Sequence, residues 1–389
     1  MGRFGLDVID VDGHIFESQE MFQRLLDDYL APMYRGALAE MISGSTDSET
    51  GKVNTPDLWR RKSSSKDVVR DKALGGVPPG IDKRERGEGR KTGTRAAIDV
   101  LDPSLRVLDL DEEGIDVTVI FPSVMIGFSA LDDLNLESAL YRAYNDFMAE
   151  FCQADAGRLK YVAVISQRDI DAGVAEARRV AGHGTAVGLY TQTHMDGKQL
   201  DHVGFHPLWE EAQAQGLAIT VHHGSAGLPP WGLGVFEMGD NWFQQHASVF
   251  LYEQMRAVAT VIGGGLLERF PKLTFAFLES GCGWLPYWLE RLDHHYELMP
   301  QYVPSLTCKP SEAFGGGQCF ISCDADEVML VDAVDALGDR SIVYASDYPH
   351  FDCKFPDTVR LIVENDGVSP AAKAHIFKDN AVQLYPRLG

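Results

Sequence analysis

Two aspartates, a histidine and a glutamate lie close together near the start of the chain, in the run Asp10-Val-Asp12-Gly-His14 and at Glu17. They follow apolar residues that predict a short buried strand. Because alternate side chains of a strand share a face, we expect Asp10, Asp12 and His14 to lie on the same side. Carboxylates and imidazoles that converge in this way can bind a divalent metal ion. Asp10 or Glu17 could help to hold a second ion, although we expect Glu17 to orient His14 or the first turn.

Three further apolar segments are each followed by similar residues. His222 and His223 come after one of them, Glu279 after another, and Asp347 after the last. Alternation lets only one of the two histidines point inward, which leaves the other to contact substrate. Glu279 and Asp347 can bind a metal or transfer protons. Turn or capping roles would explain any one of these residues, but their recurrence at four strand ends favours a metal site.

The elements that would position these residues alternate regularly. In addition to the strand before Asp12, apolar strands are predicted at 117–121, 161–165, 186–190, 217–221, 273–278, 318–322 and 341–345. Helices are predicted at 19–38, 136–154, 170–180, 207–216, 252–270 and 327–337, with another that stops at Gly114. Eight strands that alternate with helices predict a closed (β/α)8 TIM barrel, whose active site lies at the C-terminal ends of the strands.

Residues 41–100 differ in composition from the rest of the chain. They are rich in Ser, Thr, Gly, Pro and charge, which predicts a long irregular insertion after the first strand, within a single barrel domain of residues 1–389. The stretch 58–96 is strongly basic. It is interpreted either as a surface loop that pairs with the acidic body, or as a lid that presents arginines such as Arg61 or Arg95 to an anionic substrate. The second interpretation admits a CoA-linked substrate.

The overall composition narrows the function classes. The 389 residues carry a formal net charge of −22, which argues against nucleic acid or an anionic membrane as a partner. No apolar run is long enough to span a bilayer, and no signal peptide is recognised. The six cysteines lack C-x-x-C spacing, which favours reduced thiols in a cytoplasmic protein.

Four residues are weaker candidates for contact with substrate. Ser123 follows the strand at 117–121, His246 comes shortly before the helix predicted at 252–270, and Trp284 and His350 follow Glu279 and Asp347. For His246 and Trp284, a structural role in packing is the competing interpretation.

The four motifs taken together resemble a known family. Asp10-Val-Asp12-Gly-His14, Val221-His222-His223-Gly224, the segment from Glu279 to Asp293, and Ala345-Ser-Asp347-Tyr-Pro349-His350 are similar in kind and order to the amidohydrolase-related branch of the metal-dependent hydrolases. That branch includes the aminocarboxymuconate-semialdehyde decarboxylase type and the hydroxybenzoate decarboxylases. The resemblance covers about 1–30 and 101–385, and it leaves out the insertion.

The resemblance implies roles for individual residues. Asp12 and His14 correspond to the first-strand metal ligands, His222 to the fifth-strand ligand, and Asp347 to the eighth-strand ligand and proton shuttle. At strand six the decarboxylases have a histidine, whereas this chain has Glu279. That departure puts decarboxylation in doubt and enriches the site in carboxylates. The branch also implies a homo-oligomer, commonly a dimer.

These observations predict a metal-dependent enzyme that acts on a small anionic, carboxylated or carbonyl substrate, with Zn, Mn or Fe as the ion. Hydrolysis and decarboxylation both remain open, with a slight preference for hydrolysis because of Glu279. Two alternatives also stay open. One is a non-heme iron oxygenase with two irons on the same barrel, and the other is a non-catalytic barrel that binds an anion.

Overall fold

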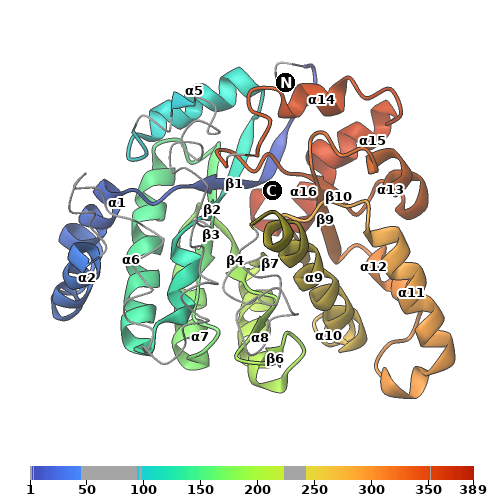
Figure 1. Cartoon of the computed structure of the whole chain (residues 1–389), viewed down its shortest axis with the longest axis horizontal. Helices are drawn as coiled ribbons and strands as arrows, with labels where there is room; N and C mark the ends of the chain where they lie inside the picture. Colours follow the sequence, from blue (N-terminus) through green and yellow to red (C-terminus); the bar gives the residue numbers. More distant parts are fainter. Residues whose placement is uncertain (1, 3, 45–93, 96–98, 223–241, 351) are drawn as a thin grey trace.

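Eight parallel strands form the centre of the molecule in the computed structural model, which describes residues 2, 4–44, 94–95, 99–222, 242–350 and 352–389. Their order in the sheet is β1-β2-β3-β4-β7-β8-β9-β10. Their bounds are β1 Ile9–Ile15, β2 Val117–Pro122, β3 Leu159–Val164, β4 Ala186–Thr191, β7 Ala218–Val221, β8 Phe275–Phe277, β9 Cys319–Cys323 and β10 Ile342–Tyr344. The helices surround these strands (Figure 1). This confirms the predicted (β/α)8 barrel.

The first and last strands are joined by individual hydrogen bonds at their C-terminal ends. The Asp347 amide donates to the Asp12 carbonyl at 3.0 Å, and the His14 amide donates to the Tyr348 carbonyl at 2.6 Å. The seam that closes the barrel therefore lies among the predicted metal ligands.

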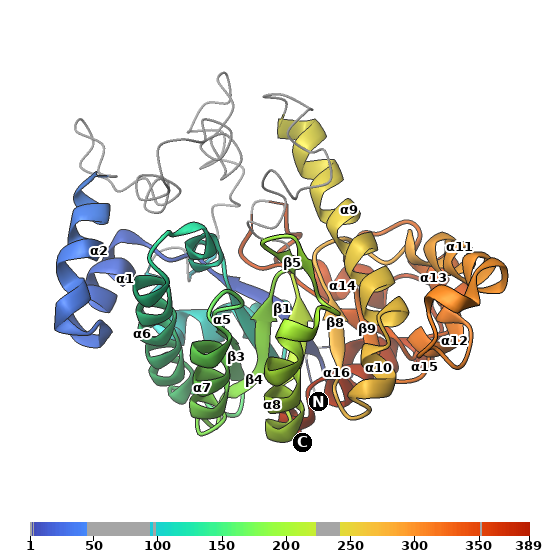
Figure 2. The same cartoon turned by 90° about the horizontal axis from the view of Figure 1, so that it is seen from below.

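The helices begin and end at residues that sequence rules recognise. Asp102, Asp133 and Asp169 accept backbone N–H groups at the starts of three helices, while Gly114 and Gly216 end two helices with positive φ. The longer helices are α5 Pro103–Glu113, α6 Leu134–Gln153, α7 Ile170–Val180, α8 His206–Gln215, α9 Trp242–Gly263, α11 Leu285–Leu298 and α13 Leu330–Leu337. Shorter ones are α10 Leu266–Arg269, α12 Pro310–Phe314, α14 Thr358–Val363, α15 Pro370–Ala374 and α16 Asn380–Leu384. Figure 2 shows that one end of α9 extends well beyond the barrel.

Two predicted helices are wrong in their extent. The segment 19–38 contains α1 Gln19–Arg24, a π-helical turn Leu25–Tyr29 and the first half of α2 Pro32–Gly44, because Leu30 is extended and Pro32 starts a new helix. The helix predicted at 252–270 begins ten residues earlier and stops at Gly263, since the chain turns through Gly265 with φ +71°. Part of the predicted insertion is therefore helical, as α2 extends to Gly44.

A bulge in β1 separates Asp10 from Asp12 and His14. Asp10 pairs with Thr118 and Gly13 with Ile120, so β1 contains one more residue than β2 over this stretch. A Cβ atom on Gly13 would lie 2.8 Å from Asp10 Oδ2, which places these two residues on the same side. The expectation that Asp10 shares the face of Asp12 and His14 is therefore wrong.

Candidate metal centre

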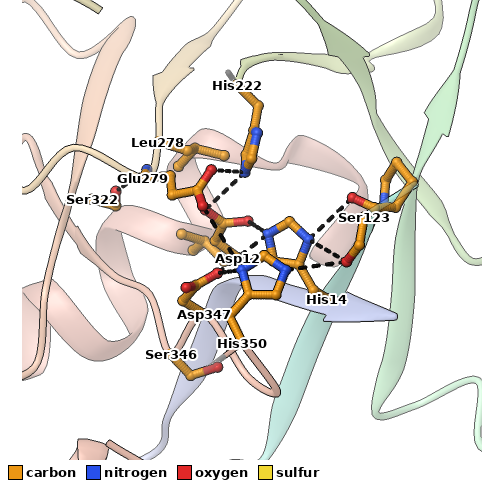
Figure 3. A network of polar contacts seen from close by, with 12 residues as sticks. Asp12, His14, Ser123, His222, Leu278, Glu279, Ser322, Ser346, Asp347 and His350 are labelled. Carbon is orange, nitrogen blue, oxygen red and sulfur yellow. Dashed lines mark hydrogen bonds and ion pairs between the residues drawn. The ribbon is translucent and has the colours of Figure 1, made fainter. Parts of the chain in front are cut away.

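The C-terminal ends of four strands bring a buried cluster of histidines and carboxylates together (Figure 3). Asp12, His14 and His222 form one set whose ligand atoms all lie within 4.8 Å of one another. His14, Asp347 and His350 form a second set that meets the same limit. Because His14 belongs to both sets, they describe one continuous site.

The hydrogen bonds of His14 determine which ring nitrogen can bind an ion. Its Nδ1 lies 3.1 Å from the Pro122 carbonyl oxygen, which can only accept, so Nδ1 bears the hydrogen. The lone pair is therefore on Nε2, which lies 3.3 Å from Asp12 Oδ1 and 3.5 Å from Asp347 Oδ1. This tautomer leaves the Nε2 lone pair available to bind a metal ion.

Three of the converging atoms fit a divalent cation. Asp12 Oδ1, His14 Nε2 and Asp347 Oδ1 are buried. Asp12 Oδ1 and His14 Nε2 make no hydrogen bond within the described ranges of the chain, and Asp347 Oδ1 is in ion-pair contact with His350 Nδ1. Burial raises the pKa of Asp12 to about 7 and lowers the pKa of His14. A divalent cation would satisfy these atoms, since mixed carboxylate and imidazole donors suit Mn²⁺, Fe²⁺ and Zn²⁺.

His222 and Glu279 extend the cluster across the barrel. His222 Nε2 lies 3.1 Å from Glu279 Oε2 and 3.8 Å from Asp12 Oδ2. Glu279 belongs to neither ligand set, and its other oxygen lies 3.8 Å from His350 Nδ1. Burial, and then the charge of Asp347, raises the pKa of Glu279 well above its usual value. Phe121 stacks on the His222 ring at 5.6 Å.

His350, predicted from the sequence only as a weak candidate for substrate contact, lies in direct contact with Asp347 and Ser123. Its Nδ1 is 2.6 Å from Asp347 Oδ1, and its Nε2 is 3.1 Å from Ser123 Oγ. The ring lies 4.0 Å from that of His14. Ser123, predicted only as a weak substrate contact, thus touches both histidines, since its Oγ is also 3.4 Å from His14 Nδ1.

Glu17 and Asp10, the two acidic residues expected to support the site, accept hydrogen bonds from the segments around it. Glu17 accepts backbone N–H groups from Ser123, Val124 and Met125, and burial raises its pKa to about 7. Asp10 accepts from Thr118 Oγ1 and from the amide and hydroxyl of Ser346. These hydrogen bonds occupy both carboxylates, and neither residue belongs to a ligand set, so they add no evidence for a second ion.

The other candidate residues lie outside this cluster or outside the described residues. Trp284 packs at the barrel wall and donates from Nε1 to the Gly281 carbonyl. His246 lies in α9, and nothing further about it follows from the structure. His223 and Arg61 fall outside the described residues. Arg95 bonds to Asp109 and Glu112 of α5, so it contacts the acidic body.

One supporting residue gave no signal in the sequence. Gln254 of α9 is fully buried, and its Nε2 donates at 2.9 Å to the carbonyls of both Val221 and Leu278. These residues directly precede His222 and Glu279. A glutamine in an apolar helix has no distinctive pattern, and only the assembled barrel shows what it connects.

A (β/α)8 barrel with buried histidines and carboxylates at its C-terminal strand ends defines the class of metal-dependent barrel enzymes. The amidohydrolase family model matches residues 9–387, and the chain belongs to the amidohydrolase family. This confirms the resemblance inferred from the motifs.

Several known proteins and solved structures are similar to this chain. A 2-amino-3-carboxymuconate-6-semialdehyde decarboxylase of Dictyostelium discoideum is 24% identical over 250 residues, which cover 64% of this chain and 67% of that protein. The 5-carboxyvanillate decarboxylase of Sphingomonas paucimobilis has a TM-score of 0.67 at 20% identity, covering 98% of this chain and 99% of the other. An amidohydrolase of Mycobacterium avium subsp. paratuberculosis has a TM-score of 0.71 at 20% identity, covering 99% and 98%. These structural likenesses agree with the barrel fold.

Proposed function

We propose that this protein is a divalent-metal-dependent, non-oxidative decarboxylase of a small carboxylated substrate. The decarboxylases named above support this choice over hydrolysis. The observation that carries the proposal is the 2.6 Å contact of Asp347 Oδ1 with His350 Nδ1, directly beside the set of ligands. This contact supports a role for Asp347 as an acid that His350 can reprotonate after it has given a proton to the substrate carbon.

Asp12, His14, His222 and Asp347 would hold the ion, and Mn²⁺ is the first candidate because a related 5-carboxyvanillate decarboxylase contains manganese. Zn²⁺ and Fe²⁺ remain the alternatives. A bound divalent ion supplies a Lewis acid that orients substrate oxygens and stabilises negative charge. Glu279, beside His222, is assigned to proton transfer.

Decarboxylation breaks the bond between the carboxylate and a substrate carbon, and both electrons of that bond stay on the carbon. Carbon dioxide leaves, and a proton must reach the same carbon. Burial raises the pKa values of Asp347 and Glu279 well above their usual range, which favours their protonated forms. His350 can return a proton to Asp347, while Ser123 holds its other nitrogen.

The test uses the metal-loaded protein and a panel of small hydroxylated aromatic and enamine carboxylates in D₂O. We expect one carbon dioxide per turnover and one deuterium at the vacated carbon. Removal of metal by chelation should abolish turnover, and Mn²⁺ should restore it. Asp347→Asn should reduce turnover by about 100-fold or more, because it removes an acid that acts in the reaction. Asp332→Asn on the exposed side of α13 is the matched control.

Other outcomes would favour the alternatives. Cleavage of amide or lactone substrates without carbon dioxide release would identify a hydrolase. Two irons per chain with a charge-transfer band would support the oxygenase. Turnover and metal content that are unchanged in Asp347→Asn would contradict the catalytic assignment and support an anion-binding barrel.

We also propose a homodimer and a single barrel domain that includes the insertion. Exposed apolar side chains at Tyr287, Leu298 and Tyr302, which are 62%, 62% and 77% exposed, support a protein contact near α11. Light scattering that gives the mass of one chain would contradict the dimer. The contact of Arg95 with α5 supports the single domain, and separate melting of the insertion would contradict it.

A cytoplasmic location is proposed from the thiols. All six cysteines are free, which suits a reducing compartment. None of the described helices combines the length and the apolar character that a membrane span requires. Fractionation that finds the protein outside the cytoplasm would contradict the location.

A further inference from the structure

Two residues outside the ligand set hold the backbone of His14 from both sides. The Tyr348 carbonyl accepts the His14 amide at 2.6 Å, and Arg106 Nη1 donates to the His14 carbonyl at 2.6 Å. The Arg106 guanidinium lies over the Tyr348 ring, 5.1 Å from its centroid. Both polar groups of the His14 backbone are therefore fixed by one stacked pair. Tyr348 also directly follows Asp347 in the chain.

The hydroxyl of Tyr348 connects this pair to the end of the insertion. It donates to Asp109 Oδ2, while Asp109 Oδ1 accepts from Arg95 Nη1 at 3.0 Å. Arg95 also bonds Glu112 at 2.7 Å. Arg95, close to the end of the basic stretch, is thus linked through Asp109 to the tyrosine that follows the proposed ligand Asp347.

Arg106 is a buried cation, so its position depends on the side chains that surround it. The side chain is 2% exposed, and its Nε and Nη2 make no hydrogen bond to any residue that the structure describes. A buried cation with few partners depends on nearby anions and on the aromatic face that it covers. Burial lowers the pKa of the Arg106 guanidinium, and the charges of Asp10 and Asp109 act against that shift. Movement of Tyr348 would therefore disturb Arg106 and, through it, the His14 carbonyl.

We propose that Tyr348 is a positioning residue of the metal centre, and that Arg95 acts through it from the end of the insertion. Docking of Arg95 on Asp109 fixes the tyrosine hydroxyl, the tyrosine fixes the backbone of His14, and the adjacent Asp347 is held at the same seam. The inference rests on the metal site proposed above. Its effect is on ion affinity and does not require contact with the ion.

The experiment measures Mn²⁺ affinity in the full-length apoprotein, without substrate, by counting free Mn²⁺ with electron paramagnetic resonance. The variants are Tyr348→Phe, Arg95→Gln and the double variant. We expect Tyr348→Phe to raise the Kd about tenfold, as loss of an outer contact of a ligand does. Arg95→Gln should raise it by a similar or smaller factor. The double variant should bind no more weakly than Tyr348→Phe, because the two residues act in series.

Matched controls separate this effect from a general loss of a tyrosine hydroxyl or an arginine. Tyr302→Phe removes an exposed hydroxyl, and Arg178→Gln breaks the pair with Glu211 between α7 and α8. Neither should change the Kd. A Kd for Tyr348→Phe within twofold of wild type, or independent factors that multiply in the double variant, would overturn the proposal.

Two further measurements complete the test. A fall in the folded fraction of the metal-free variants that matches the loss of affinity would also overturn the proposal, because it would show a structural role only. Wild-type protein that binds no Mn²⁺, Zn²⁺ or Fe²⁺ would overturn the proposed metal site itself. Tight Mn²⁺ binding by the wild type, with the same Kd in every variant, would overturn only this inference.

Discussion

Glu279 has a backbone conformation that disfavours its own side chain. Its φ is +58°, in the left-handed region where a residue with a Cβ costs about 1–2 kcal/mol. The adjoining turn is held by Glu327, which accepts the amides of Cys282 and Gly283 at 2.6–3.0 Å. The fold thus keeps an acid beside His222 in a strained position, which is typical of a functional site.

Glu279→Gly should make the metal-free protein more stable and less active. The change relieves the left-handed strain and removes a partly buried carboxyl, which together outweigh the added entropy of the unfolded chain. We expect the free energy of unfolding to rise by about 1 kcal/mol, measured by denaturant titration. Turnover should fall by about 100-fold. Asp196→Gly, at φ +49° in the turn between β5 His194–Met195 and β6 Lys198–Gln199, is the control for strain alone and should keep its activity. An E279G protein that is less stable than wild type would contradict this explanation.

At the scale of elements, α9 joins two strand ends through one amide. Gln254 donates to the carbonyls that precede His222 and Glu279, so the helix fixes the spacing between β7 and β8 at the site. The contact of His222 Nε2 with Glu279 Oε2 at 3.1 Å depends on that spacing.

Gln254→Met keeps the length of the side chain and removes both hydrogen bonds. It leaves the Leu278 carbonyl buried without this donor, so we expect a loss of about 1–3 kcal/mol in the free energy of unfolding. The Kd for Mn²⁺ should rise about tenfold. Gln215→Met, which breaks only a helix-surface bond to Glu211, is the control. Wild-type Mn²⁺ affinity in Gln254→Met would show that α9 does not set the site.

A contact between α5 and α14 should make the stability of the protein depend on pH. Glu113, at the end of α5, accepts from Thr358 Oγ1 at 2.8 Å and from the Val359 amide at 3.0 Å of α14, and burial raises its pKa to about 7. A carboxyl whose pKa is higher in the folded state than the usual 4.5 destabilises the fold when it ionises. Relative to Glu113→Gln, wild type should therefore lose stability as pH rises from about 4.5 to about 7, by up to about 3 kcal/mol, and change little above. Denaturant titrations at several pH values measure this, with Glu290→Gln on exposed α11 as the control. A parallel pH dependence in wild type and Glu113→Gln would contradict the assignment.

The strands and the site residues at their ends were predictable because the sequence patterns that mark them are local. Apolar runs that end in Asp12, His222 and Asp347 mark both a strand and its C-terminal end in a single stretch. The extra residue in β1 was not predictable, since a bulge depends on the register with β2. The partners of Glu17 lie more than 100 residues away, so the sequence indicated only that it supports the first turn. Pro32 was a local signal that would have divided the segment 19–38 correctly.

At the scale of the whole molecule, binding of the ion should raise the free energy of unfolding of the whole barrel. Its proposed ligands come from β1, from the ends of β7 and β10, and from no single contiguous segment. An ion that binds only the folded chain stabilises it in proportion to the logarithm of its concentration.

Removal of metal should therefore lower the melting temperature, and Mn²⁺ should raise it with increasing concentration. At 100 times the Kd we expect about 2.7 kcal/mol of added stability. Asp347→Asn should lose most of this gain, while Asp332→Asn should retain it. Calorimetry with and without chelator measures the effect. A melting temperature that does not respond to Mn²⁺, Zn²⁺ or Fe²⁺ would contradict a site of this kind.

The seam at which β1 meets the end of β10 has a consequence for how the protein is made. His14 leaves the ribosome more than 300 residues before Asp347, and the two backbone bonds that join their strand ends require both. A nascent chain that lacks the last strand would lack part of the proposed metal site, whatever the ion concentration around it. We therefore expect metal uptake to follow synthesis and closure of the barrel, so that the loaded ion marks chains that have finished folding.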